Sequence, residues 1–124
     1  MKLSMKYLIA AAVYGVIGMG LGIVMGAQQE FSMAPVHAHI NLLGWVALTL
    51  YGLVYHVVPS MTNGKLGTIQ FYLANIGLLL MIPALTMVLK GNTSVVPVLA
   101  VGEICTIAAL ILFLVNLWKN RAQA

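Results

Sequence analysis

Four long runs of apolar residues, separated by short polar breaks, set the pattern of this sequence. The runs cover residues 5–27, 35–58, 68–89 and 95–118. Each is close to the roughly 20 apolar residues that an α-helix needs to cross the hydrocarbon core of a bilayer. The pattern therefore predicts an all-α membrane protein with four transmembrane helices.

Prolines and a polar loop mark the breaks between the runs. Residues 28–34 form the first loop, and Pro35 suits the first turn of the second helix, where a missing N–H costs nothing. Pro59 ends that helix. Pro83 falls inside the third run and predicts a kink in the third helix.

The first run has two interpretations, a membrane span and a secretory signal peptide. The apolar region of a signal peptide covers about 7–15 residues. This run is longer, so we expect a span. Its residues Gly18, Gly22 and Gly26 follow one another at intervals of four, a spacing that lets a neighbouring helix approach closely. They predict a packing face on the first helix.

Composition indicates one membrane-embedded unit. Of the 124 residues, 62% are hydrophobic and 6% are charged, whereas a soluble domain has about 25% charged residues. We therefore expect a single domain over residues 1–124, in contact with membrane lipid. Basic and aromatic residues are not interleaved, so no nucleic-acid-binding surface is indicated. Cys105, the one cysteine, lies in an apolar run and is interpreted as a packing residue.

The distribution of basic residues predicts the orientation of the helices. With four spans, both termini and the middle loop lie on one side, which holds Lys2, Lys6, Lys65, Lys119 and Arg121. The other side holds Lys90. Because basic residues collect on the cytoplasmic side, we expect both termini to be cytoplasmic and the helices to span a bacterial inner (plasma) membrane.

The candidate chemistry lies in residues 35–45, which hold His37 and His39. Ionisable residues inside a membrane usually serve a function. Successive residues of an α-helix are turned by about 100°, so residues two apart point to opposite sides. His37 and His39 therefore cannot bind the same ion or haem from one helix. A tetrahedral zinc site, which needs about four converging ligands, is disfavoured. Another interpretation places both rings at the membrane interface, bound to headgroups and water.

The helix surfaces below the two rings differ in character. α-Helical spacing places Asn41, Gly44, Trp45, Tyr51 and Tyr55 below His37, and Leu43, Val46, Leu50 and Val57 below His39. Gly44 leaves space for a flat macrocycle, and the Leu/Val surface offers an apolar wall. Both surfaces suit the edge of a haem, which must be held non-covalently because the chain has no C-x-x-C-H motif.

The segment His39-Ile40-Asn41 resembles the second transmembrane helix of the catalytic subunit of the haem-copper oxidase superfamily, nearest to the nitric-oxide reductases. In that family a His-x-Asn early in this helix carries an axial ligand of the low-spin haem. The resemblance implies that role for His39, with Asn41 beside it. The family helix begins at the outer face, in agreement with the distribution of basic residues. The other three runs resemble the family in hydropathy alone.

The family fold implies an assembly as well as a ligand. Its catalytic subunits have twelve helices in three arcs of four, and a homotrimer of this chain resembles that ring. A later family helix carries His-x-His, with its two histidines serving haems in adjacent pores, and His37-Ala38-His39 has this spacing. The resemblance implies a haem b clamped between His37 of one subunit and His39 of its neighbour.

The chain also departs from the family. It has no adjacent His-His pair and no third histidine near the first two, so the copper site is missing. We therefore do not expect the chain by itself to be an oxidase. A haem with two histidine ligands has no open position for a substrate. Electron transfer and redox or nitric-oxide-related sensing remain, with a redox protein or a quinol as the partner.

Two further ionisable groups are candidates for a proton or polar site. Glu103 lies about two turns into the fourth helix, where a charged carboxylate costs roughly 2.5–3.5 kcal/mol on insertion scales, so it should be protonated, paired or facing a wet cavity. His56 lies about 28 Å along the helix from His37 and is interpreted as an interfacial residue. Two other functions stay open: a metal or proton transport subunit using His37, His39 and Glu103, and a non-catalytic assembly or interaction protein.

Overall fold

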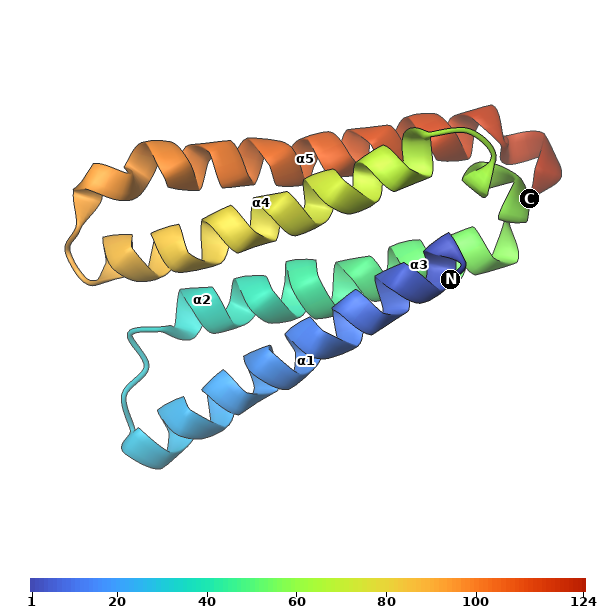
Figure 1. The fold of residues 1–124 in the computed structure, drawn as a ribbon. Helices are drawn as coiled ribbons and strands as arrows, with labels where there is room; N and C mark the ends of the chain where they lie inside the picture. The colour runs from blue at the N-terminus through green and yellow to red at the C-terminus, as the bar shows by residue number, and fades with distance from the viewer.

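The structure is a computed structural model that describes residues 1–124. Three of its long helices are α1 (Leu3–Gln28), α4 (Leu66–Leu89) and α5 (Val96–Lys119), shown in Figure 1. The fourth long helix covers Ala34–Val57 in three consecutive parts. These are α2 (Ala34–His39), a π-helical segment (Ile40–Val46) and α3 (Ala47–Val57).

All four long helices are apolar enough and long enough to cross a membrane. The predicted all-α, four-helix architecture of a multi-pass membrane protein is therefore confirmed, with bounds that differ by at most two residues. Short 3₁₀ turns at Pro59–Thr62, Thr93–Val95 and Arg121–Gln123 follow or precede the long helices. α4 continues through Pro83 without a break.

The helices form two antiparallel pairs that lie side by side. α1 packs against the π-helical segment and α3, while α4 packs along the whole of α5 (Figure 1). Both termini lie at one end of the bundle, together with the loop between α3 and α4. The loops between α1 and α2 and between α4 and α5 lie at the opposite end. His37 and His39, at the start of the second long helix, therefore lie far from the termini.

An aromatic cluster joins the two pairs at the end that holds the termini. The Tyr7 ring is fully buried, stacks on Tyr55 with centroids 5.3 Å apart, and meets Phe71 edge-on at 5.0 Å. Its hydroxyl donates a hydrogen bond of 3.2 Å to the carbonyl of Gly67. Aromatic pairs of this kind contribute about 0.5–1.5 kcal/mol beyond the area that they bury.

Beside this cluster, a buried polar network links α3, α4 and α5. The Tyr55 hydroxyl donates to Gln70 Oε1 at 2.5 Å and accepts from Asn116 Nδ2 at 3.1 Å. Asn116 Nδ2 also donates to the carbonyl of Met61 at 2.9 Å. Each bond satisfies a polar group that neither lipid nor the apolar core could satisfy. The network fixes the register of the three helices at this end.

Glycines let α4 and α5 approach until their backbones touch. A Cβ added to Gly77 would lie 2.9 Å from the carbonyl oxygen of Gly102, and one added to Gly102 would lie 2.8 Å from that of Gly77. Small residues at a crossing point are the usual means of close packing between membrane helices. The outward surfaces of the long helices are apolar, as a lipid-facing surface requires, with examples at Val16, Ile23, Val57, Leu79 and Trp118.

Candidate functional site

Glycines of α1 form notches that receive the polar residues at the start of the second long helix. A Cβ added to Gly22 would lie 2.8 Å from His37 Cε1, and one added to Gly18 would lie 2.7 Å from Asn41 Nδ2. The predicted packing face is therefore confirmed at these two positions. Gly26 is not part of it, because a Cβ there meets nothing within 4 Å.

His37 is held in its notch by a hydrogen bond that also defines its tautomer. Its Nδ1 lies 2.7 Å from the carbonyl oxygen of Gly18. A carbonyl can only accept, so Nδ1 carries a hydrogen and cannot also accept from Asn41 Nδ2, which lies 3.2 Å away. In the neutral ring the lone pair is then on Nε2. Asn41 Nδ2 donates to the backbone carbonyl of His37 at 2.9 Å, so Asn41 ties the same helical turn together. The half-buried His37 side chain thus contacts α1.

His39 has the same kind of anchor on the other side of the helix. Its Nδ1 lies 2.6 Å from the carbonyl oxygen of Pro35, one turn earlier. By the same argument Nδ1 carries the hydrogen, and the lone pair of Nε2 is free. Histidines that bind metals usually donate their second ring N–H to a carbonyl or carboxylate. Both rings therefore have the tautomer that a metal ligand needs.

The groove beside His39 is built from three of the four long helices. It has a volume of about 280 Å³ and is lined by His39, Leu43, Tyr51, Met81, Glu103, Thr106, Ile107 and Leu110. Its walls are mostly apolar, with His39 and Glu103 as the ionisable groups. Glu103, on α5, is exposed to the groove and forms no hydrogen bond or ion pair within the chain. The fold thus brings His39 and Glu103 to one surface, while His37 lies elsewhere.

A π-helical segment begins directly after the two histidines. Residues Ile40–Val46 adopt this wider helix, which occurs frequently at functional sites and was not expected from the sequence. The additional residue in each π-helical turn changes the direction in which the side chains of α3 point, relative to a continuous α-helix. Tyr51, which was expected below His37, lines the groove with His39, and its ring also meets Tyr7 of α1 edge-on, with centroids 5.9 Å apart. Of the Leu/Val wall expected below His39, only Leu43 lines that groove.

Gly44 serves contact between helices within the chain. A Cβ added to Gly44 would lie 2.7 Å from both Cβ and Cγ of Tyr14 on α1. The space that we expected for a macrocycle beside Gly44 is therefore filled by Tyr14. The next residue, Trp45, packs its ring on Gly15 in the same way. Sequence reasoning missed these partners because nothing in the second run indicates which side chains of α1 face it.

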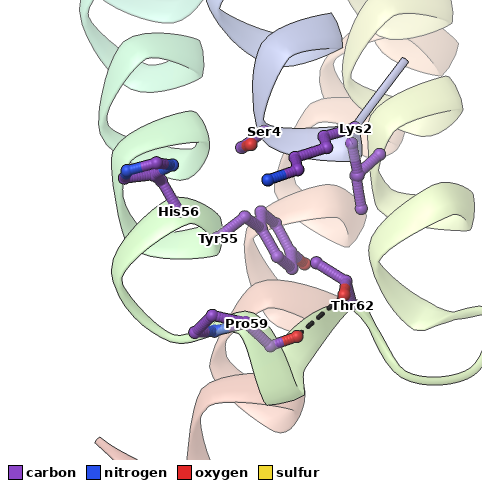
Figure 2. Close-up of a pocket in the computed structure, with 7 residues that line it drawn as sticks. Lys2, Ser4, Tyr55, His56, Pro59 and Thr62 are labelled. Atoms are coloured by element: carbon purple, nitrogen blue, oxygen red, sulfur yellow. Dashed lines mark hydrogen bonds between the residues drawn. The ribbon is translucent and has the colours of Figure 1, made fainter.

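His56 lies at the opposite end of the bundle. It is exposed, and it lines a separate cavity with Lys2 and Tyr55 (Figure 2). His56 and Glu103 therefore belong to different sites. Nowhere in the chain do three His, Cys, Asp or Glu side chains come together as a metal site. No family model, curated protein sequence or solved structure matches this chain.

Proposed function

We propose that the chain is a b-type haem protein of the bacterial inner membrane, with His39 Nε2 as an axial ligand. The observation that carries the proposal is the hydrogen bond at Nδ1 of His39. The carbonyl of Pro35 accepts this bond, so in the neutral ring the lone pair is on Nε2, beside a mostly apolar groove. This supports the role implied by the resemblance to the haem-copper oxidase catalytic subunit.

The second axial ligand comes from a neighbouring copy. His37 and His39 contact different parts of the chain, Gly18 on α1 and the groove beside α5, so one chain offers one histidine per side. The groove, at about 280 Å³, is also below the range of roughly 300–1,000 Å³ that ligand pockets usually have. Both observations support a homotrimer in which His37 of one subunit faces His39 of the next. Both termini of each subunit are cytoplasmic.

The residues of the chain would hold the haem and tune its surroundings. When bound, a haem b with two histidine ligands exchanges single electrons and leaves no position for a substrate. Leu43 and Leu110 exclude water from one edge of the groove, and Glu103 adds a protonatable group there. These features suit electron transfer with a redox protein or a quinol, or redox sensing.

An absorption spectrum of the purified protein, oxidised and then reduced with dithionite, tests this proposal. We expect a sharp reduced α-band that carbon monoxide leaves unchanged. His39→Ala and His37→Ala should each lose the haem, because each removes one axial nitrogen. His56→Ala is the matched control and should retain it, since His56 lies at the other end of the bundle. A His37→Ala protein with an unaltered low-spin spectrum would refute the shared clamp.

One observation favours a second candidate function, proton transport. Glu103 and His39 line the same groove and lie on membrane-length helices, and ionisable pairs of this kind occur in proton relays. On this alternative, purified protein is colourless, and proteoliposomes show a proton flux that Glu103→Gln abolishes. Haem in the wild-type protein, together with a proton flux that Glu103→Gln leaves unchanged, would exclude proton transport through this groove.

A further inference from the structure

A second cavity lies at the end of the bundle that holds both termini. It has a volume of about 440 Å³ and is bounded by the start of α1, the end of α3 and the 3₁₀ turn that follows. Its lining residues are Lys2, Leu3, Ser4, Tyr55, His56, Pro59 and Thr62. Figure 2 shows the Lys2 amine directed between Ser4 and Tyr55, with His56 on the opposite wall. The cavity does not include any residue of the His39 groove.

The electrostatic character of this cavity is positive. Lys2 contributes an ammonium group, and His56 contributes a ring N–H. The chain has two acidic residues, Glu30 and Glu103, and neither lines the cavity. Most of the other cations gather at the same end of the bundle, at Lys6, Lys65, Lys119 and Arg121. No acidic side chain therefore lines the cavity to neutralise Lys2, and an anion from outside the chain would do so.

The cavity also offers hydrogen-bond donors that have no partner within the chain. Ser4 is 6% exposed and lines the cavity, yet its hydroxyl forms no hydrogen bond. It lies in the first turn of α1. The backbone N–H groups of the same turn lack partners as well, because Lys2 provides no side-chain cap. The Ser4 hydroxyl and these N–H groups are donors that an oxyanion in the cavity would accept from.

We propose that this cavity binds the phosphate of an anionic phospholipid headgroup. An ammonium group, an imidazole N–H and the Ser4 hydroxyl are donors that phosphate oxygens accept from, and a helix start adds favourable N–H groups. The residues that line the cavity lie at the ends of membrane-length helices, and helices that span the hydrocarbon core end near the lipid headgroups. A lipid there would anchor the start of α1 to the end of α3. The inference does not depend on haem.

Competitive lipid retention tests the proposal. The full chain is purified with equal amounts of phosphatidylglycerol and phosphatidylcholine, and the retained lipid is identified by native mass spectrometry. We expect phosphatidylglycerol to be retained preferentially. The variant Lys2→Gln/His56→Gln should reduce that preference about tenfold. Lys65→Gln is the matched control, because it removes a charge from the same end without changing the cavity lining.

A third arm distinguishes a lipid from free phosphate. Inorganic phosphate at millimolar concentration should leave phosphatidylglycerol bound, because it lacks the acyl chains that hold the lipid at the membrane. Displacement of the lipid by inorganic phosphate would assign the cavity to a soluble anion and overturn the lipid proposal. If Lys65→Gln and the double variant lost the preference for phosphatidylglycerol to the same extent, the cavity would not be the binding site. Circular dichroism confirms that each variant is folded.

Discussion

Replacing Gly22 by alanine tests whether α1 seats the His37 ring. The Cβ of the new side chain would lie 2.8 Å from His37 Cε1, whereas carbon atoms in contact lie about 3.5–4.0 Å apart. The imidazole must therefore retreat by roughly 0.7 Å or more. Its Nδ1, now 2.7 Å from the Gly18 carbonyl, then moves beyond the usual hydrogen-bond limit of about 3.2 Å.

The added methyl group can destabilise the fold in two ways, and the less costly of the two determines the change in the free energy of unfolding. If the ring stays, overpacking costs about 1–3 kcal/mol. If it moves, the lost hydrogen bond costs about 0.5–1.5 kcal/mol. We therefore expect Gly22→Ala to reduce the free energy of unfolding by about 0.5–1.5 kcal/mol relative to its control.

Gly20→Ala is that control. Gly20 lies in the same helix, and a Cβ there meets nothing within 4 Å. Both variants gain the same helix propensity, about 0.8–1 kcal/mol for glycine to alanine. The difference between them thus isolates the contact with His37. Gly20→Ala by itself should be as stable as the wild type or slightly more stable.

The assay has two readouts, one for stability and one for the ring. Unfolding by sodium dodecyl sulfate in mixed micelles, followed by circular dichroism, compares the free energies of the two variants. Nitrogen-15 NMR of labelled histidine then reports which ring nitrogen of His37 carries the hydrogen and whether it is hydrogen-bonded. Equal stabilities together with an unchanged His37 signal in Gly22→Ala would refute the reasoning that α1 seats this ring.

Two further predictions concern other parts of the molecule. Gly102→Ala should destabilise the α4–α5 pair by about 1–3 kcal/mol or more, because its Cβ would lie 2.8 Å from the Gly77 carbonyl oxygen and a backbone atom cannot rotate away. Unfolding in mixed micelles measures this loss, and a variant as stable as the wild type would contradict the prediction. At the exposed loop, Ser32 hydrogen bonds lower the pKa of Glu30. The lowered pKa stabilises the folded loop above the ordinary carboxyl pKa, and this contribution disappears as the pH falls through the folded pKa. Ser32→Ala should raise the Glu30 pKa toward its ordinary value in an NMR titration, and an unshifted curve would show that the Ser32 hydroxyl has no part in it.

Much of the fold follows from the sequence because a bilayer restricts the structures that can cross it. In lipid every backbone polar group must be satisfied within the segment, so a long apolar run is a helix. Its ends follow from proline, from polar residues and from the thickness of the hydrocarbon core. This is why all four helices were predicted to within two residues. The spacing of Gly18 and Gly22 likewise predicted a packing face on α1.

The candidate site was predictable only in its residues and not in its arrangement. The two-residue spacing of His37 and His39 already indicates that they point apart, since a helical turn alone determines that. The hydrogen-bond partners of the two rings do not follow from spacing. They depend on which carbonyls the neighbouring turns present, Gly18 for His37 and Pro35 for His39.

The sequence by itself determined the four spans, the glycine face and the opposition of the two histidines, because these depend on local spacing and on the thickness of the bilayer. The tertiary structure alone decided which surfaces meet. The π-helical segment rotated Tyr51 to the His39 side, Tyr14 filled the space at Gly44, and α5 brought Glu103 to the groove. These outcomes depend on contacts between residues far apart in the chain, where hydropathy is uniform and carries no information about partners.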